Sequence, residues 1–194
     1  DDKLKKMTPI NYTLLTTPAE IDQLLDLQKS NLPQNISAPE AQSQGFVTVE
    51  HDFELLKAMN DAEAHVIAKD QQQVVGYCLV MLASFQDRVP VLQPMFALLD
   101  GLSYQNKSLT TYQYFVMGQV CVAKDHRGRG IFDGMYQGLK QYYHQKYDFV
   151  VTEVATRNTR SIKAHQRVGF ELLHRYTDPR GEEWDVILWD WRTQ

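Results

Sequence analysis

Apolar residues recur with two different periods along this chain, and these periods predict a succession of strands and helices. Residues 65–69 and 74–82 are short apolar runs joined by the polar turn Asp70-Gln71-Gln72, which is typical of a β-hairpin. The second run is apolar at successive positions, so it is predicted to be a central strand with both faces buried. Further strands are predicted at 10–15, 112–122, 149–155, 170–176 and 184–191.

Four segments carry the helical period instead. The first, 18–30, has a complete start signal, with Thr17 as the cap, Pro18 at the first position and Glu20 closing a capping box. The order β-α-α-β-β-β-α-β-α-β-β predicts an α/β fold of the mixed α+β type. The remaining helices are predicted at 53–59, 131–146 and 159–168.

Two stretches show neither period. Residues 31–45 are polar with two prolines and are expected to form a loop. Residues 84–111 are irregular, and prolines and a glycine interrupt a short apolar segment at 95–99. Long irregular connections in compact domains are usually binding loops or lids, so we expect this one to lie on the substrate side.

Length and charge restrict the class of protein. The 194 residues are expected to form one domain, 1–194, with a substantial core. The formal net charge of −4 gives no overall attraction to nucleic acid or anionic membranes, and no apolar run reaches the roughly 20 residues that span a bilayer. The polar start has no secretory signal, and residues 1–6 are expected to be disordered or to precede a native start at Met7. Cys78 and Cys121 lie in apolar runs, so we expect buried free thiols in a reducing cytoplasm.

A basic, glycine-rich turn, Arg127-Gly128-Arg129-Gly130, joins the strand ending near 122 to the helix beginning at 131. No Ser, Thr, Asp or Asn stands at the usual N-cap position, so the first amide groups of the helix lack a side-chain acceptor. Such amides at the positive end of a helix dipole are typical of a phosphate cradle, although a solvated turn is the simpler alternative. A Walker A loop would need a Lys-Ser or Lys-Thr pair, and the glycine spacing is too wide for a Rossmann fingerprint.

The run Arg127-Gly128-Arg129-Gly130-Ile131 resembles the acetyl-coenzyme A loop of the GCN5-related N-acetyltransferases (the GNAT family), Gln/Arg-x-x-Gly-x-Gly/Ala. Residues 152–158 and 161–170 resemble the second half of that family, in which a strand is followed by Asn, a short helix and a Tyr-x-x-x-Gly-Phe ending. The clear resemblance covers about residues 112–176. It implies a central, mixed, mostly antiparallel sheet of about seven strands flanked by helices.

The resemblance also implies acetyl-coenzyme A (acetyl-CoA) as cosubstrate and no metal. In the family, the strand before the cradle bulges, and its free backbone pairs with the pantetheine arm. Gly118 is the expected bulge, and Asn158 is expected both to cap the next helix and to bind that arm.

Phe132 replaces the family's Gly or Ala, and we expect its ring to turn into the core. Arg160 and Lys163 are either solvated or near the 3′-phosphate. The implied cofactor-binding positions are Val120, Cys121, Val122, Arg127, Gly128, Arg129, Gly130, Ile131, Phe132, Asp133, Asn158 and Ser161.

Two positions are candidates for catalysis. Glu153 matches the general base of family members that acetylate protein N-termini, and the alternative is a surface residue of an alternating strand. His165 stands where the family's Tyr commonly protonates the departing thiolate, and the alternative is a histidine on the helix surface.

Together these features predict an acetyl-CoA-dependent N-acetyltransferase that acts by direct attack of a primary amine, from a small molecule or a peptide, on the thioester. The expected state is a monomer or homodimer, without nucleic-acid or membrane partners. A non-catalytic acyl-CoA sensor or interaction module is the alternative on the same fold, and a nicotinamide-dependent oxidoreductase is a third possibility.

Overall fold

A seven-stranded sheet forms the centre of the computed structural model, which describes residues 8–35, 37 and 49–192. The predictions for residues 1–6, and for most of the 31–45 loop, lie outside the described residues. The strand order is β1-β2-β3-β6-β7-β9-β8, and only β6 and β7 run parallel. This confirms the mixed, mostly antiparallel sheet. The strands are β1 (Ile10–Leu14), β2 (Val66–Asp70), β3 (Gln73–Met81), β6 (Tyr114–Val122), β7 (Phe149–Ala155), β8 (Glu171–Thr177) and β9 (Glu183–Asp190).

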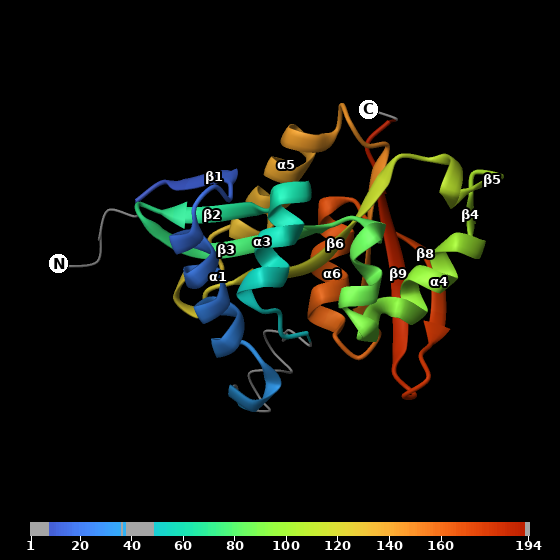
Figure 1. The fold of residues 1–194 in the computed structure, drawn as a ribbon, viewed down its shortest axis with the longest axis horizontal. Coiled ribbons are helices and arrows are strands. Elements are labelled where there is room, and N and C mark those ends of the chain that lie inside the picture. The colour runs from blue at the N-terminus through green and yellow to red at the C-terminus, as the bar shows by residue number, and fades with distance from the viewer. Residues whose placement is uncertain (1–7, 36, 38–48, 193–194) are drawn as a thin grey trace.

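Helices cover both faces of the sheet. One core layer joins the sheet to α1 (Pro18–Ser30), α3 (Phe53–Ala62) and α4 (Gln93–Gly101). The other joins it mainly to α5 (Ile131–Tyr143), with α6 (Thr159–Val168) at its margin. Figure 1 shows α1 and α3 over the β1–β3 half of the sheet and α4 near β8 and β9. Short 3-10 helices occupy η1 (Pro33–Asn35), η2 (Ala83–Arg88), η3 (Pro90–Leu92), η4 (Leu109–Thr111) and η5 (Lys124–His126).

The predicted start of α1 is confirmed in detail. The Thr17 hydroxyl accepts a hydrogen bond from the Glu20 amide at 3.2 Å, and the Glu20 carboxylate accepts one from the Thr17 amide at 3.1 Å. This reciprocal pair satisfies amides that the first helical turn leaves without partners.

The irregular structure predicted throughout 84–111 is wrong for its central part. Residues 93–101 form α4, which buries Met95, Phe96 and Leu99 on one side. Pro94 lies in the first turn, where a missing amide breaks no helical hydrogen bond, so this proline does not interrupt the helix. A two-stranded hairpin, β4 (Ser103–Tyr104) and β5 (Lys107–Ser108), follows α4.

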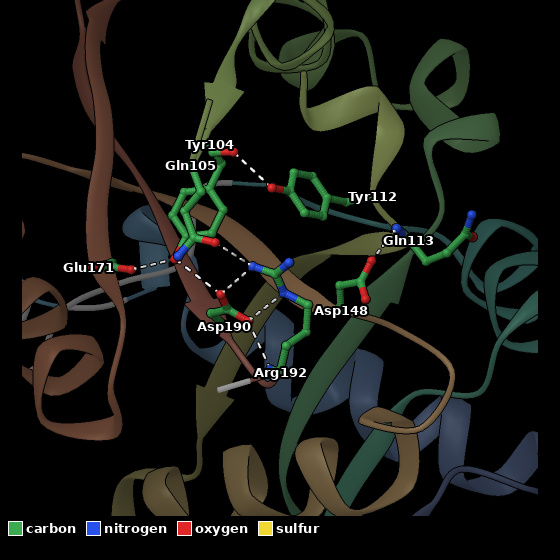
Figure 2. A network of polar contacts seen from close by, with 8 residues as sticks. All are labelled: Tyr104, Gln105, Tyr112, Gln113, Asp148, Glu171, Asp190 and Arg192. Carbon is green, nitrogen blue, oxygen red and sulfur yellow. Dashed lines mark hydrogen bonds and ion pairs between the residues drawn. The ribbon is translucent and has the colours of Figure 1, made fainter. Parts of the chain in front are cut away.

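Polar side chains attach this hairpin to β8 and β9, the last two strands of the main sheet (Figure 2). The Tyr104 hydroxyl lies 2.9 Å from a Glu171 oxygen and 3.2 Å from an Asp190 oxygen. Arg192 binds the Asp190 carboxylate and also donates to the Gln105 side chain at 2.9 Å. The hairpin therefore fixes the C-terminal end of α4 against β8 and β9.

Candidate active site

The central feature of the site is a bulge in β6. Cys78 of β3 pairs with Val120, whereas Val80 pairs with Met117, so β6 contains one extra residue between these pairs. That residue lies within Gly118–Gln119, which confirms the bulge expected at Gly118. Gly lacks a Cβ, so the chain bends there with little steric cost.

Beyond the bulge, β6 and β7 separate. Their parallel pairing covers only 114–116 with 149–151, and the described residues beyond these pair with β3 on one side and with β9 on the other, not with each other. The backbone of Val120 and Val122 is thus left facing a gap between two strands rather than a neighbouring ladder. An extended ligand with amide groups would complete the missing hydrogen bonds.

The glycine-rich turn leads into α5 as the sequence predicts. Gly128 and Gly130 both have left-handed backbone, with φ of 77° and 76°, and Gly130 occupies the N-cap position without any side-chain cap. A Cβ built on either glycine would meet nothing within 4 Å. The first amides of α5 therefore face open space at the positive end of its dipole, which fits a phosphate group.

A cleft of about 600 Å³ extends from this turn to α6. It contains four cationic side chains, of which Arg160 and Lys163 have no ion-pair partner in the part of the chain that the structure describes. The cleft is lined by Val120, Cys121, Val122, Arg127, Gly128, Gly130, Ile131, Phe132, Asp133, Asn158 and Ser161, together with Arg160, Lys163 and Arg167.

Arg129 is the predicted cofactor residue that does not line this cleft. Its guanidinium donates to the Thr8 carbonyl at 3.0 Å and lies 4.0 Å from the Asp70 carboxylate. The side chain therefore joins the turn to the N-terminal edge of the sheet. The sequence predicts Arg129 among the cofactor-binding residues, but these two acceptors direct its guanidinium away from the cleft.

The Phe132 ring points into the core, as the sequence analysis expects. Its ring packs edge-on against the rings of Tyr136 and His165, with centroids 5.1 and 5.0 Å apart. Asp133, the next residue, forms a bidentate ion pair with Arg167 at 2.8 and 3.0 Å. The Phe132 ring is thus held toward the core, and its backbone amide remains at the start of α5.

A second, smaller cavity of about 100 Å³ lies on the other side of the bulge and contains Glu153. Burial raises the pKa of Glu153 to about 7, against the opposing effect of a 2.5 Å hydrogen bond from the Tyr176 hydroxyl. A carboxyl group with such a pKa changes charge near neutral pH, as a general base requires. The alternative of a surface-facing Glu153 is wrong, because the strand turns this residue into the cavity.

His165 is buried, with only 1% of its surface exposed, so the alternative of a helix-surface histidine is also wrong. Its Nδ1 lies 2.7 Å from the Ser161 carbonyl, which can only accept, so Nδ1 carries the proton. Nε2 then accepts from the Tyr136 hydroxyl at 2.6 Å. Burial lowers the pKa of His165 to about 4, so the ring is neutral at physiological pH. Its role as an acid stays a prediction, and these engaged nitrogens weigh against it.

The two cavities meet at three residues that line both of them, Val120, Asn158 and Ser161. Asn158 caps α6 as predicted, accepting from the Ser161 amide at 3.4 Å. This junction places a group bound along the cleft next to the Glu153 cavity. Any reaction between ligands of the two cavities would take place here.

Tyr176 and the apolar wall of the inner cavity could not be predicted from the sequence pattern. Tyr176 comes from β8 and reaches Glu153 of β7 across the intervening strand β9. Leu92 and Met95 enter from η3 and α4, which places the 84–111 segment beside the inner cavity. The irregular pattern indicated the general location of that segment but not the residues that it contributes.

Comparison with known families identifies the chain. The sequence model of the Acetyltransferase (GNAT) family matches residues 21–170, well beyond the span of the recognisable motifs. The chain belongs to the GNAT family. No curated protein sequence matches this GNAT protein.

Solved structures share the fold at low sequence identity. The NatC complex bound to Gag peptide and CoA aligns with a TM-score of 0.64 at 11% identity, covering 94% of this chain and 99% of that chain. YncA of Salmonella typhimurium, described as a putative acetyltransferase with its cofactor acetyl-CoA, gives 0.60 at 14%, covering 95% of each chain. The ribosomal-protein-S18-alanine N-acetyltransferase of Escherichia coli gives 0.59 at 11%, covering 96% of each. These similarities establish the GNAT fold.

The described residues lack two further features. None of their helices combines the length and apolar character needed to cross a bilayer. Within the same residues, no group of three or more His, Cys, Asp or Glu side chains is placed to hold a metal ion.

Proposed function

We propose that this GNAT protein is an acetyl-CoA-dependent N-acetyltransferase that acts on a primary amine. One observation carries the proposal: a cleft lined by glycines and cationic side chains and a cavity that contains the buried Glu153 carboxyl group meet between two separated strands. Acetyl transfer needs such a junction, because the acyl donor and the amine must approach from different sides.

The cleft fits the chemical groups of coenzyme A. The Gly128–Gly130 turn and the first amides of α5 would hold the pyrophosphate, and Arg160 and Lys163 would meet the 3′-phosphate. The unpaired backbone of Val120 and Val122 would bind the pantetheine amides. Acetyl-CoA would supply an activated acetyl group as a thioester. The acetyl-CoA of the Salmonella typhimurium protein supports this assignment by similarity of fold.

Glu153 would act as the general base. An amine attacks a carbonyl only when its nitrogen lone pair is free, and the attacking nitrogen must lose a proton to become an amide. The Glu153 carboxyl group lines the inner cavity, where it would accept this proton directly or through a water molecule. The proton then leaves to solvent when Glu153 returns to its charged form.

The residues that line the inner cavity favour a monoamine or a peptide N-terminus as the acetyl acceptor. Its wall includes Leu92, Met95 and Met117, and Glu153 is its one carboxylate among the described lining residues. A polyamine carries several positive charges and would need several acidic partners. Relatives of the fold bind both kinds of ligand, since one was solved with a Gag peptide and others are spermidine N-acetyltransferases.

A non-catalytic acyl-CoA sensor is the second candidate. The buried Glu153 favours the enzyme, because a sensor has no use for a costly desolvated carboxyl group.

We further propose that the protein works in the cytoplasm as a monomer or homodimer. The two described cysteines are buried free thiols, which supports a reducing compartment.

The test is thiol release from acetyl-CoA with a panel of monoamines, polyamines and short peptides. We expect turnover with at least one monoamine or peptide, and Glu153→Gln should reduce it by about 10²–10⁴-fold. Glu54→Gln, at an exposed position of α3, is the matched control and should leave turnover unchanged. Binding of CoA without turnover of any amine would support the sensor. Stabilisation by NADPH instead of CoA would contradict both candidates.

A further inference from the structure

The site contains a hydroxyl group at the place where the acyl donor and the amine would meet. Ser161 lies in the first turn of α6 and lines both the cofactor cleft and the inner cavity. When an amine displaces a thioester, the sulfur leaves with a negative charge. A donor near that sulfur stabilises the charge as it develops.

His165 cannot supply this donor without breaking its own contacts. Its Nδ1 proton is held by the Ser161 carbonyl at 2.7 Å, and its Nε2 accepts from Tyr136 inside the core. The same Nδ1 also lies 3.3 Å from the Ser161 hydroxyl oxygen. Because Nδ1 carries the proton, the hydroxyl accepts in this contact, and its own hydrogen is free to be donated to a group bound in the junction.

Other donors in the inner cavity are engaged elsewhere. The Thr152 hydroxyl donates to the Met117 carbonyl at 2.7 Å, and the Trp184 indole donates to the Asp178 carboxylate at 3.0 Å. The Gln119 amide donates to the Val49 carbonyl at 2.8 Å. Asn158 also reaches the junction; its side-chain oxygen accepts from the Ser161 amide in the cap of α6, and the family resemblance assigns this side chain to the pantetheine arm rather than to the sulfur.

We propose that the Ser161 hydroxyl donates a hydrogen bond to the sulfur of the departing thiolate, and that His165 is the positioning residue that orients this hydroxyl. This inference rests on the proposed acetyl transfer. The nitrogen–carbon bond forms as the carbon–sulfur bond breaks, and the sulfur keeps the bonding electron pair. Glu153 takes the amine proton and releases it to solvent, and the thiolate takes a proton from water as CoA leaves.

The decisive measurement is the pKa of the thiol of bound CoA, read from the ultraviolet absorbance of the thiolate. Complexes with CoA and with desulfo-CoA are compared across pH, so that tyrosine ionisation cancels. The protein's own thiols do not interfere, because burial raises the pKa of Cys121 to about 12 and that of Cys78 higher still. The readout therefore reports the sulfur environment and does not depend on turnover.

We expect Ser161→Ala to raise the pKa of the bound thiol by about 1–2 units, as the loss of a hydrogen bond to a charged group does. It should lower kcat about 10–100-fold and change CoA affinity less than about threefold. Ser161→Thr keeps a hydroxyl and should recover part of both effects. Thr159→Ala, an exposed position of the same helix turn, is the control and should change neither.

The outcomes separate this inference from the proposed function. An unchanged thiol pKa and kcat in folded Ser161→Ala would overturn the role of Ser161 while leaving the acetyltransferase proposal intact. A shifted thiol pKa without turnover of any amine would overturn the acetyltransferase proposal but uphold the contact of Ser161 with sulfur. Absence of CoA binding by the unmodified protein would overturn both.

Discussion

At the residue scale, Tyr176 controls how readily Glu153 gives up its proton. Burial raises the pKa of the Glu153 carboxyl group, whereas the Tyr176 hydroxyl donates to the charged carboxylate and lowers it. Asp178 adds a smaller rise through its negative charge. The value of about 7 is thus a balance between the loss of water and one short hydrogen bond.

Tyr176→Phe removes the hydrogen bond that stabilises the charged Glu153 carboxylate and leaves the burial of this residue in place. We expect the pKa of Glu153 to rise by about one unit, because a hydrogen bond to a charged group contributes roughly that much. The base is active when deprotonated, so the acidic limb of the kcat/KM profile should move to higher pH. Turnover should fall near pH 7 and approach that of the unmodified protein near pH 9.

The control is Tyr104→Phe, a tyrosine whose hydroxyl also binds carboxylates but lies in the hairpin network of Figure 2. It should leave the pH–rate profile in place. An acidic limb that stays fixed in Tyr176→Phe would show that another group limits the reaction at low pH.

At the element scale, the start of α5 requires glycine for both its backbone and its open surface. Gly130 has φ of 76°, where a Cβ is strained, yet there is space around it. We therefore expect Gly130→Ala to cost about 1 kcal/mol in stability and to weaken CoA binding moderately. Gly130→Glu should abolish detectable binding, because its carboxylate would repel the pyrophosphate at the cradle.

Isothermal titration with CoA measures these changes in CoA affinity. Gly101→Glu is the matched control, because its Cβ position is equally open and lies at the end of α4, away from the cleft residues. It should bind CoA normally. Unchanged affinity in folded Gly130→Glu would remove the cradle assignment.

The β4–β5 hairpin is held by a polar network that depends on Tyr104. Its hydroxyl bridges Glu171 and Asp190, and its ring packs on Phe149 with centroids 5.6 Å apart. Tyr104→Phe keeps the ring and loses the bridge, so we expect the free energy of unfolding to fall by about 1 kcal/mol. Urea denaturation measures this loss, and exposed Tyr142→Phe serves as control. A fall in CoA affinity as well would show that the hairpin also shapes the cleft.

At the scale of the whole molecule, three buried histidines make the fold sensitive to acid. His51, His65 and His165 are at most 4% exposed, and burial lowers the pKa of each to about 4. The unfolded chain takes up these protons near pH 6.5. Between pH 6.5 and 4 the unfolded state therefore binds more protons, and stability falls as the pH is lowered.

Glu153 acts in the opposite direction, because its raised pKa makes the folded state bind one more proton between about pH 7 and 4.5. Three histidines outweigh one carboxyl group, so we expect a net loss on the order of 5 kcal/mol from pH 7 to 4.5, at about 1.4 kcal/mol per pKa unit. Urea unfolding at a series of pH values measures it. Replacing the exposed His144 by Ala should not change how the free energy of unfolding depends on pH. A free energy of unfolding that does not change between pH 7 and 4.5 would contradict the neutral state of the three buried rings.

The sequence by itself determined most of the elements and most of the residues that line the proposed cofactor cleft. Thr17 and Glu20 cap α1, the glycines leave α5 without a cap, and Gly118 marks the bulge. These features depend on residues a few positions apart, whose conformational preferences act within a single turn or strand. Local chemistry is therefore enough to predict them.

Only the tertiary structure decided which side chains are buried together. Tyr176 reaches Glu153 across β9 because the fold brings both of their strands alongside that strand, and His165 is neutral because Tyr136 and Phe132 enclose it. Arg129 leaves the cleft for the Thr8 carbonyl, 121 positions away in the chain. Burial and charge depend on how distant segments pack, since desolvation is a property of the assembled core rather than of the local sequence. The order of the strands thus set the protonation states on which the proposed chemistry depends.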